Sequence, residues 1–128
     1  MIVETSAIVA MMLEEPDAPA LMSRVHGAEC ETTVVNAFEA VLSVGRVIEN
    51  YPLAKELVPE FLKEVGIEMV GVDAATYADV VDAYLRYGKG TGHPARLNFG
   101  DCFSYAMAKR AGVPLLYKGD DFSKTDLA

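Results

Sequence analysis

Four carboxylates in this sequence stand where they could do chemistry. Glu4 closes the short apolar run at 1–3, Asp121 comes soon after another apolar run, and Asp101 opens an otherwise apolar helical segment. Glu39 interrupts a long apolar stretch. Four acids gathered in one partly dry pocket would repel one another, and a hard divalent cation is the usual remedy. The pattern therefore predicts a magnesium or manganese site and, through it, phosphoryl chemistry.

Two of these acids also have ordinary structural explanations. Aspartate is favoured at helix N-termini, where backbone N–H groups are unpaired, so Asp101 taken alone is more often a cap than a catalyst. A glutamate in a long helix usually faces water, which is the plain interpretation of Glu39. However, Asn36 and Ser43 share its helix face at spacings of three and four, and the surrounding apolar surface leaves little room for solvent. Glu39 is therefore a candidate for a polar pocket.

The elements that must position the acids alternate between strands and helices. Strands are predicted at 1–4, 28–31, 67–70 and 113–117, and helices at 5–14, 17–24, 33–48, 51–65, 73–87 and 101–111. The helix at 33–48 is apolar over most of its surface and is expected in the core. Pro59 is expected to interrupt or restart the helix at 51–65.

This alternation predicts one domain over residues 1–128, with a three-layer α/β/α architecture and a mainly parallel central sheet. In such folds ligands bind beyond the carboxyl ends of the strands. Glu4 and Asp121 both follow a predicted strand, and the helix that begins near Asp101 should open on the same edge. We therefore expect the acids to meet there.

Composition limits the possible functions. The formal net charge of −8 opposes unaided nucleic-acid binding, although divalent cations among clustered carboxylates would reverse the local field. The same charge suits a basic partner segment. No apolar run approaches the roughly 20 residues of a membrane span, and the first residues lack a signal peptide's positive flank, so a cytoplasmic protein without a membrane partner is expected. Cys30 and Cys102 are predicted to be buried free thiols.

Four stretches give the chain a family resemblance. These are ETSA at 4–7, NAFE at 36–39, LNFGDCFSYA at 97–106 and LLYKGDDF at 115–122. In this order, and over essentially the whole chain, the sequence resembles the PIN-domain ribonucleases, specifically the VapC-type toxins of toxin–antitoxin pairs. The resemblance implies a magnesium-dependent endoribonuclease acting on structured RNA, often transfer RNA. It implies that Glu4, Glu39, Asp101 and Asp121 are the catalytic, metal-binding acids.

The resemblance also implies partners. It implies a homodimer and a cognate VapB-type antitoxin, whose C-terminal segment often inserts a basic side chain into the acid pocket. Thr5, Ser6 and Asn36 are expected to form hydrogen bonds with the acids and to orient them. Asp120 is a candidate auxiliary ligand, although its position suits a turn residue better.

The chain departs from the family at its first acid. The family motif is Asp-Thr-Ser-Ala, whereas this chain has Glu4. The extra methylene moves the carboxylate by about 1.5 Å, and a misplacement near 1 Å can cost on the order of a hundredfold in rate. A second interpretation is therefore a PIN-like domain that binds RNA or antitoxin with little or no cleavage.

A third interpretation is a phosphoacceptor receiver domain, which also combines an acidic magnesium pocket with an α/β sheet. Asp73 and Lys118, each following a predicted strand, would be its acceptor and its lysine. The sequence lacks the acid pair expected after the first strand, and this interpretation gives Glu39 and Asp101 no role.

Overall fold

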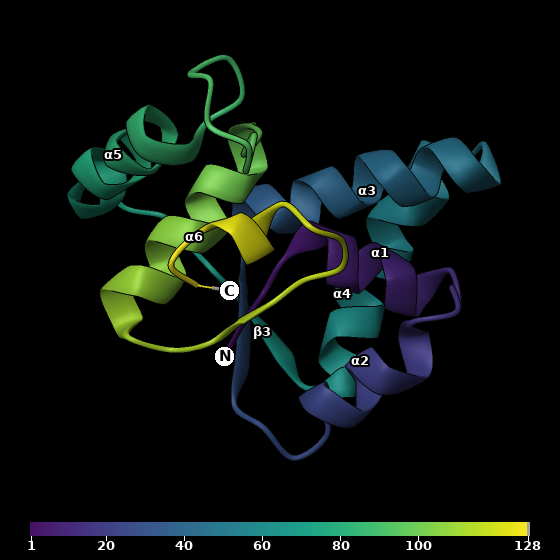
Figure 1. Ribbon diagram of the computed structural model, residues 1–128. Coiled ribbons are helices and arrows are strands. Elements are labelled where there is room, and N and C mark those ends of the chain that lie inside the picture. The colour runs from purple at the N-terminus through teal and green to yellow at the C-terminus, as the bar shows by residue number, and fades with distance from the viewer. Residues whose placement is uncertain (128) are drawn as a thin grey trace.

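The computed structural model describes residues 1–127 and is organised around one parallel sheet (Figure 1). Its strands are β1 (Ile2–Val3), β2 (Cys30–Thr33), β3 (Ile67–Val70) and β4 (Leu115–Leu116), in the order β3-β2-β1-β4. All three neighbouring pairs are parallel. Because the first strand of the chain is central, the carboxyl ends of β1 and β4 lie side by side.

Within residues 1–127, six helices and two short 3-10 helices accompany the strands. They are α1 (Thr5–Met12), α2 (Ala18–Val25), α3 (Val34–Ile48), α4 (Tyr51–Val65), η1 (Ala74–Thr76), α5 (Tyr77–Tyr87), α6 (Phe99–Ala111) and η2 (Phe122–Lys124). None of them, over the part of the chain that the structure describes, is long and apolar enough to cross a membrane.

Two hydrophobic cores lie on opposite faces of the sheet. Val3 and Leu116 belong to the core shared with α1, α2, α3 and α4, whereas Ile2 and Leu115 belong to the core shared with α5 and α6. Successive side chains of a strand point to opposite faces, so each two-residue strand contributes to both cores. Figure 1 shows α5 and α6 on one side of the strands and α2 and α4 on the other. The predicted three-layer architecture is confirmed.

Several local predictions were wrong. Strand β2 begins at Cys30 rather than at residue 28, and it accommodates a buried threonine because the hydroxyl of Thr32 donates to the Val3 carbonyl at 2.7 Å. Pro59 lies inside α4, which continues past it. The buried Val58 and Leu62 flank the proline, and their packing offsets the hydrogen bond that it lacks.

Helix α3 is not the core helix that its composition predicts. Its buried apolar residues form a narrow stripe that includes Ala37, Ala40 and Val44, whereas Phe38 and Val47 are exposed. The helix packs mainly against α4 and α1. The apolar composition of α3 therefore overestimates its burial, and part of its apolar surface faces outward.

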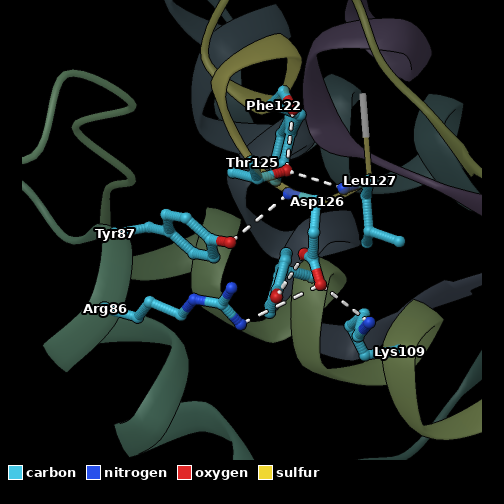
Figure 2. Close-up of polar contacts among 8 residues, drawn as sticks. Arg86, Tyr87, Lys109, Phe122, Thr125, Asp126 and Leu127 are labelled. Carbon is cyan, nitrogen blue, oxygen red and sulfur yellow. Dashed lines mark hydrogen bonds and ion pairs between the residues drawn. The ribbon is translucent and has the colours of Figure 1, made fainter.

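The segment around Asp126 is held by a group that we call the C-terminal anchor: Asp126, Tyr87, Tyr105 and Lys109. Figure 2 shows the contacts that Asp126 makes with Tyr87 and Lys109. The Asp126 carboxylate accepts hydrogen bonds from the Tyr105 hydroxyl at 2.6 Å and from the Lys109 ammonium at 2.8 Å. The Asp126 backbone N–H donates to the Tyr87 hydroxyl at 3.3 Å. The anchor ties the segment after β4 to α5 and α6, and this segment includes η2.

Candidate active site

The predicted acids line one cavity of about 360 Å³ at the carboxyl ends of β1 and β4. Glu4 caps α1, Glu39 lies on α3, Asp101 lies in the first turn of α6, and Asp121 precedes η2. In Figure 1 the yellow segment that holds η2 passes between α6 and α1. Four segments that are distant in sequence thus bring four carboxylates to one place.

Glu4 is turned back toward the helix that it caps. Its Oε2 accepts a hydrogen bond from the backbone N–H of Ser6 at 2.8 Å and a second from the Ser6 hydroxyl. The Ser6 hydroxyl oxygen in turn accepts from the backbone N–H of Lys118 at 2.9 Å. Only 3% of Glu4 is exposed. The first acid is therefore a buried helix cap as well as part of the cavity wall.

Asp101 also combines capping with a place in the cavity. Its Oδ2 accepts from the Asn98 backbone N–H at 2.9 Å, and the Asn98 side chain accepts from the Asp101 backbone N–H at the same distance. This reciprocal capping box starts α6 at Phe99 and not at residue 101 as predicted, so Gly100 lies inside the helix. The cap and site interpretations of Asp101 are compatible, because one carboxylate occupies both positions.

Glu39 lies against the first turn of α6. A Cβ atom added to Gly100 would lie 1.8 Å from Glu39 Oε1, so the absence of a side chain there makes room for the glutamate. The Thr5 hydroxyl donates to Glu39 Oε1 at 2.9 Å. The half-buried Glu39 is thus positioned by α1 and α6 together.

A buried amide ties the same elements together beneath the acids. Asn36 is fully buried, and its Nδ2 donates to the Thr5 hydroxyl at 3.1 Å and to the Ser104 hydroxyl at 3.2 Å. Its Oδ1 accepts from the Thr33 hydroxyl at 2.5 Å. Because buried polar groups are costly unless paired, this network fixes the relative positions of α1, α3 and α6.

The carboxyl groups of the cavity have raised pKa values. Burial, followed by the nearby charge of Asp101, raises the pKa of Glu4 to about 8. Burial also raises the pKa of Glu39, and burial with the neighbouring Asp121 raises that of Asp101. Each shift means that the folded protein disfavours the ionised carboxylate. A positive charge placed among these groups would relieve that cost.

The donor set suits a hard divalent cation in its chemistry. All four candidate ligands are carboxylates, and together they make the cavity electronegative. Among residues 1–127, however, no three His, Cys, Asp or Glu side chains already converge on a common metal position. Magnesium usually keeps several waters and takes one or two carboxylates directly, so prior convergence of three is not required. The residues fit the ion in charge and ligand type.

The residues predicted to support the acids lie at different positions relative to the cavity. Thr5 and Ser6 line the cavity, and Asn36 lies below it in the hydrogen-bonded network. Asp120 is exposed and is absent from the described lining of the cavity, so the turn interpretation describes it better. Asp73 caps η1 after edge strand β3, whereas Lys118 follows β4 at the opposite edge. The receiver interpretation requires these two residues to meet, and the sheet order separates them.

Other residues at the cavity had no role in the sequence-based prediction of a nuclease site. Asn98, Glu15 and Lys118 line the cavity, and Ser104 completes the Asn36 network. Ser104 could have been found, because a residue three positions after Asp101 shares its helix face. Glu15 comes close only through the fold, and no local pattern indicates it.

Comparisons with known proteins agree with this architecture. The family described as the PIN domain matches residues 1–127. A VapC ribonuclease of Rhizobium meliloti is 42% identical over 139 residues, covering 98% of this chain and 97% of the relative. Ribonuclease VapC42 of Mycobacterium tuberculosis is 41% identical over 128 residues, covering 99% and 96%.

A solved structure has the same fold. The crystal structure of VapC20 of Mycobacterium tuberculosis, described as a sarcin-ricin loop cleaving toxin, superposes with a TM-score of 0.76. The match covers 99% of this chain and 95% of that one, at 14% sequence identity. At that identity the likeness concerns the fold alone.

Proposed function

Because this chain belongs to the PIN-domain family and is similar to VapC ribonucleases over its whole length, we propose that it is a magnesium-dependent endoribonuclease toxin. It would hydrolyse phosphodiester bonds in structured RNA such as transfer RNA, with manganese as an alternative cation. One observation carries the proposal. Glu4, Glu39, Asp101 and Asp121 line a single cavity although they come from four separate segments.

The residues of the chain divide the work of such a site. Asp101 and Glu39 present carboxylate oxygens that the capping box and the Thr5 hydroxyl keep in place. Glu4 and Asp121 add carboxyl oxygens from the segments that follow β1 and β4. A bound divalent cation would supply charge neutralisation, polarisation of the phosphoryl group and activation of water. The Asn98 backbone N–H partly offsets the burial that raises the pKa of Asp101, and a bound cation would favour the ionised form further.

Changing Asp101 to asparagine tests the proposal. Asn keeps the size and can still cap α6, but it removes a charged ligand, so cleavage of a transfer RNA preparation in magnesium should fall by roughly a hundredfold or more. Gel analysis of time courses measures the rate. Asp120→Asn is the matched control, because it removes the same charge from a neighbouring turn outside the cavity. Equal cleavage by Asp101→Asn and the unaltered protein would refute the proposal.

A second candidate function keeps the fold without turnover. It is favoured by the observation that Glu4 Oε2 is already engaged by both the N–H and the hydroxyl of Ser6. Such a domain would bind RNA or antitoxin and cut little. Binding of RNA by the unaltered protein, with no cleavage in magnesium or manganese, would favour this candidate over the nuclease.

We also propose a cytoplasmic protein that forms a homodimer and is neutralised by a cognate VapB-type antitoxin. The net charge of −8 and the acidic cavity suit a partner segment with basic side chains. A mainly apolar cavity of about 600 Å³ at α5 and α6 supports protein association, and Tyr77 and Phe99 in its lining are each 74% exposed. Light scattering on the purified protein measures the dimer, and the neighbouring reading frame identifies the antitoxin.

A further inference from the structure

One cation lies among the acids. Within the part of the chain that the structure describes, Lys118 supplies the single positively charged side chain that lines the acidic cavity. Its side chain is 34% exposed, so it lies at the rim and not in the interior. The same lining contains five carboxylates, those of Glu4, Glu15, Glu39, Asp101 and Asp121.

Two contacts hold Lys118 in this position. Its backbone N–H donates to the Ser6 hydroxyl at 2.9 Å, which attaches the end of β4 to the cap of α1. Its ammonium Nζ donates to Glu15 Oε1 at 2.5 Å. Glu15 follows α1, so this ion pair joins the two segments across the mouth of the cavity. The backbone contact fixes where the side chain begins, and the ion pair determines where it ends.

The ion pair is easy to exchange. Pairs between partly exposed side chains contribute little to stability, because water solvates both charges well. A lysine ammonium is also a compact charge on a flexible stem with three rotatable donors, so it can change partners without a change of backbone. A phosphate group offers anionic oxygens of the same kind as the carboxylate of Glu15.

An RNA strand would need such a cation. The protein has a net charge of −8, and the cavity concentrates carboxylates where a polyanion must approach. A divalent ion among the acids would compensate for the phosphate that reacts, but the neighbouring phosphates would still meet the negative rim.

We propose that Lys118 Nζ binds a phosphate oxygen of the RNA strand beside the reacting phosphate, and that Glu15 is its partner until RNA displaces it. This inference rests on the proposed nuclease function. Lys118 is then a substrate-binding residue, and Glu15 is a competing partner that holds the ammonium at the rim only while no RNA is bound. The inference predicts that the two partners have opposite effects on RNA affinity, although they form one ion pair.

Steady-state cleavage of a labelled RNA stem-loop in magnesium tests this pairing. Lys118→Met should raise KM about tenfold, as expected for the removal of one charged hydrogen bond, with a smaller change in kcat. The slope of log kcat/KM against log salt should become shallower by roughly 0.7, because the variant neutralises one phosphate fewer. Lys118→Arg should keep the salt slope. Glu15→Gln should lower KM about twofold, because the ammonium is released and a repelling charge is removed.

Lys55→Met is the matched control, because it removes an exposed lysine charge from α4, outside the cavity lining. It should leave both KM and the salt slope unchanged. If Lys118→Met and Glu15→Gln raise KM and lower Tm alike, the ion pair is a structural link and the inference is overturned. An equal effect of Lys55→Met would also overturn it, as a general charge effect. If Lys118→Met does not fold, the direction of the Glu15→Gln effect decides. Failure of the unaltered protein to cleave RNA would instead refute the nuclease proposal, and this inference with it.

Discussion

Helix α6 contributes to two carboxylate sites that are built in opposite ways. At its start, Asp101 enters a cavity where burial and the neighbouring Asp121 raise its pKa. Further along, Lys109 and Tyr105 donate hydrogen bonds to Asp126, and these contacts hold the pKa of Asp126 below its ordinary value. The same helix therefore supports one acid whose charge the protein opposes and one whose charge it compensates.

The difference distinguishes a structural site, the C-terminal anchor, from a binding site, the acidic cavity. The C-terminal anchor is complete within the chain, because its carboxylate has cationic and hydroxyl donors at hydrogen-bond distance. The acidic cavity brings carboxyl groups together without enough cationic partners from the chain itself. Keeping them ionised there costs folding free energy, but it favours the binding of a cation. The anchor in turn holds the segment that carries Asp121, so the self-contained site helps to build the open one.

The largest effect should come from filling the space that Gly100 leaves for Glu39. Gly100→Ala would place a Cβ 1.8 Å from Glu39 Oε1, so the glutamate must leave its position in the cavity. A displacement of about 1 Å at a reacting centre costs on the order of a hundredfold in rate, and we expect a loss of that size in RNA cleavage. The anchor should stay intact, so thermal unfolding should remain cooperative.

Gly71→Ala is the control for this change. Apart from its two chain neighbours, no atom of residues 1–127 lies within 4 Å of a Cβ added at Gly71, and Gly71 is not among the described residues that line the acidic cavity. The control should cleave like the unaltered protein. If Gly100→Ala cleaved equally well, the position of Glu39 would not matter for turnover, and the cavity would lose one of its four proposed ligands.

A smaller effect should follow from shortening the first acid. Glu4→Asp keeps a residue that caps helices well and has a lower intrinsic pKa, so more of it is ionised and available to a cation. We expect kcat/KM for RNA cleavage in magnesium to rise about tenfold, a fraction of what a 1 Å error can cost. Asp126→Glu is the matched control, since it changes side-chain length at the anchor. An unchanged rate in Glu4→Asp would show that the glutamate already fits the site.

The sequence predicted the positions of the four acids better than it predicted the residues around them. Asp121 was placed by the rule that ligands gather beyond the carboxyl ends of parallel strands, and Glu39 by its shared helix face with Asn36. Asp101 was recognised correctly as a first-turn residue. The inferences for Glu39 and Asp101 rest on local spacing, which the backbone periodicity determines directly, and the inference for Asp121 rests on the alternation of strands and helices.

Features that depend on distant contacts were missed. The pairing of Lys118 with Glu15 joins residues 103 positions apart, and no pattern within either segment indicates it. Helix α3 was assigned to the core because its composition is apolar, but burial depends on how many neighbours cover it, and Phe38 is 61% exposed. Pro59 was overestimated as a breaker, since the packing of Val58 and Leu62 was not visible in the sequence.

The smallest effect should be on stability, and it should have opposite pH dependence at the two sites. Burial raises the pKa of Glu4 from 4.5 to about 8. With a chelator present to remove divalent cations, the folded state therefore keeps a proton between these two pH values that the unfolded state has lost. The free energy of unfolding should therefore fall as pH rises from about 5 to 8. Glu4→Gln removes this titration and should make the decline shallower, by up to about 1 kcal/mol per pH unit.

Asp126 should behave as the counterpart in the same experiment. Its pKa is lowered, chiefly by Lys109, so its contribution to stability is present above its ordinary pKa of 3.8 and is lost only as pH falls through the lowered value. Asp126→Asn should therefore reduce the free energy of unfolding by about 1 kcal/mol, or Tm by about 4 °C, with the same slope as the unaltered protein between pH 5 and 8. Thermal denaturation in chelator measures both variants. If Asp126→Asn changed the slope and Glu4→Gln did not, the uncompensated charge would lie at the anchor and not in the cavity, because only a group that titrates differently in the folded and unfolded states can produce a slope.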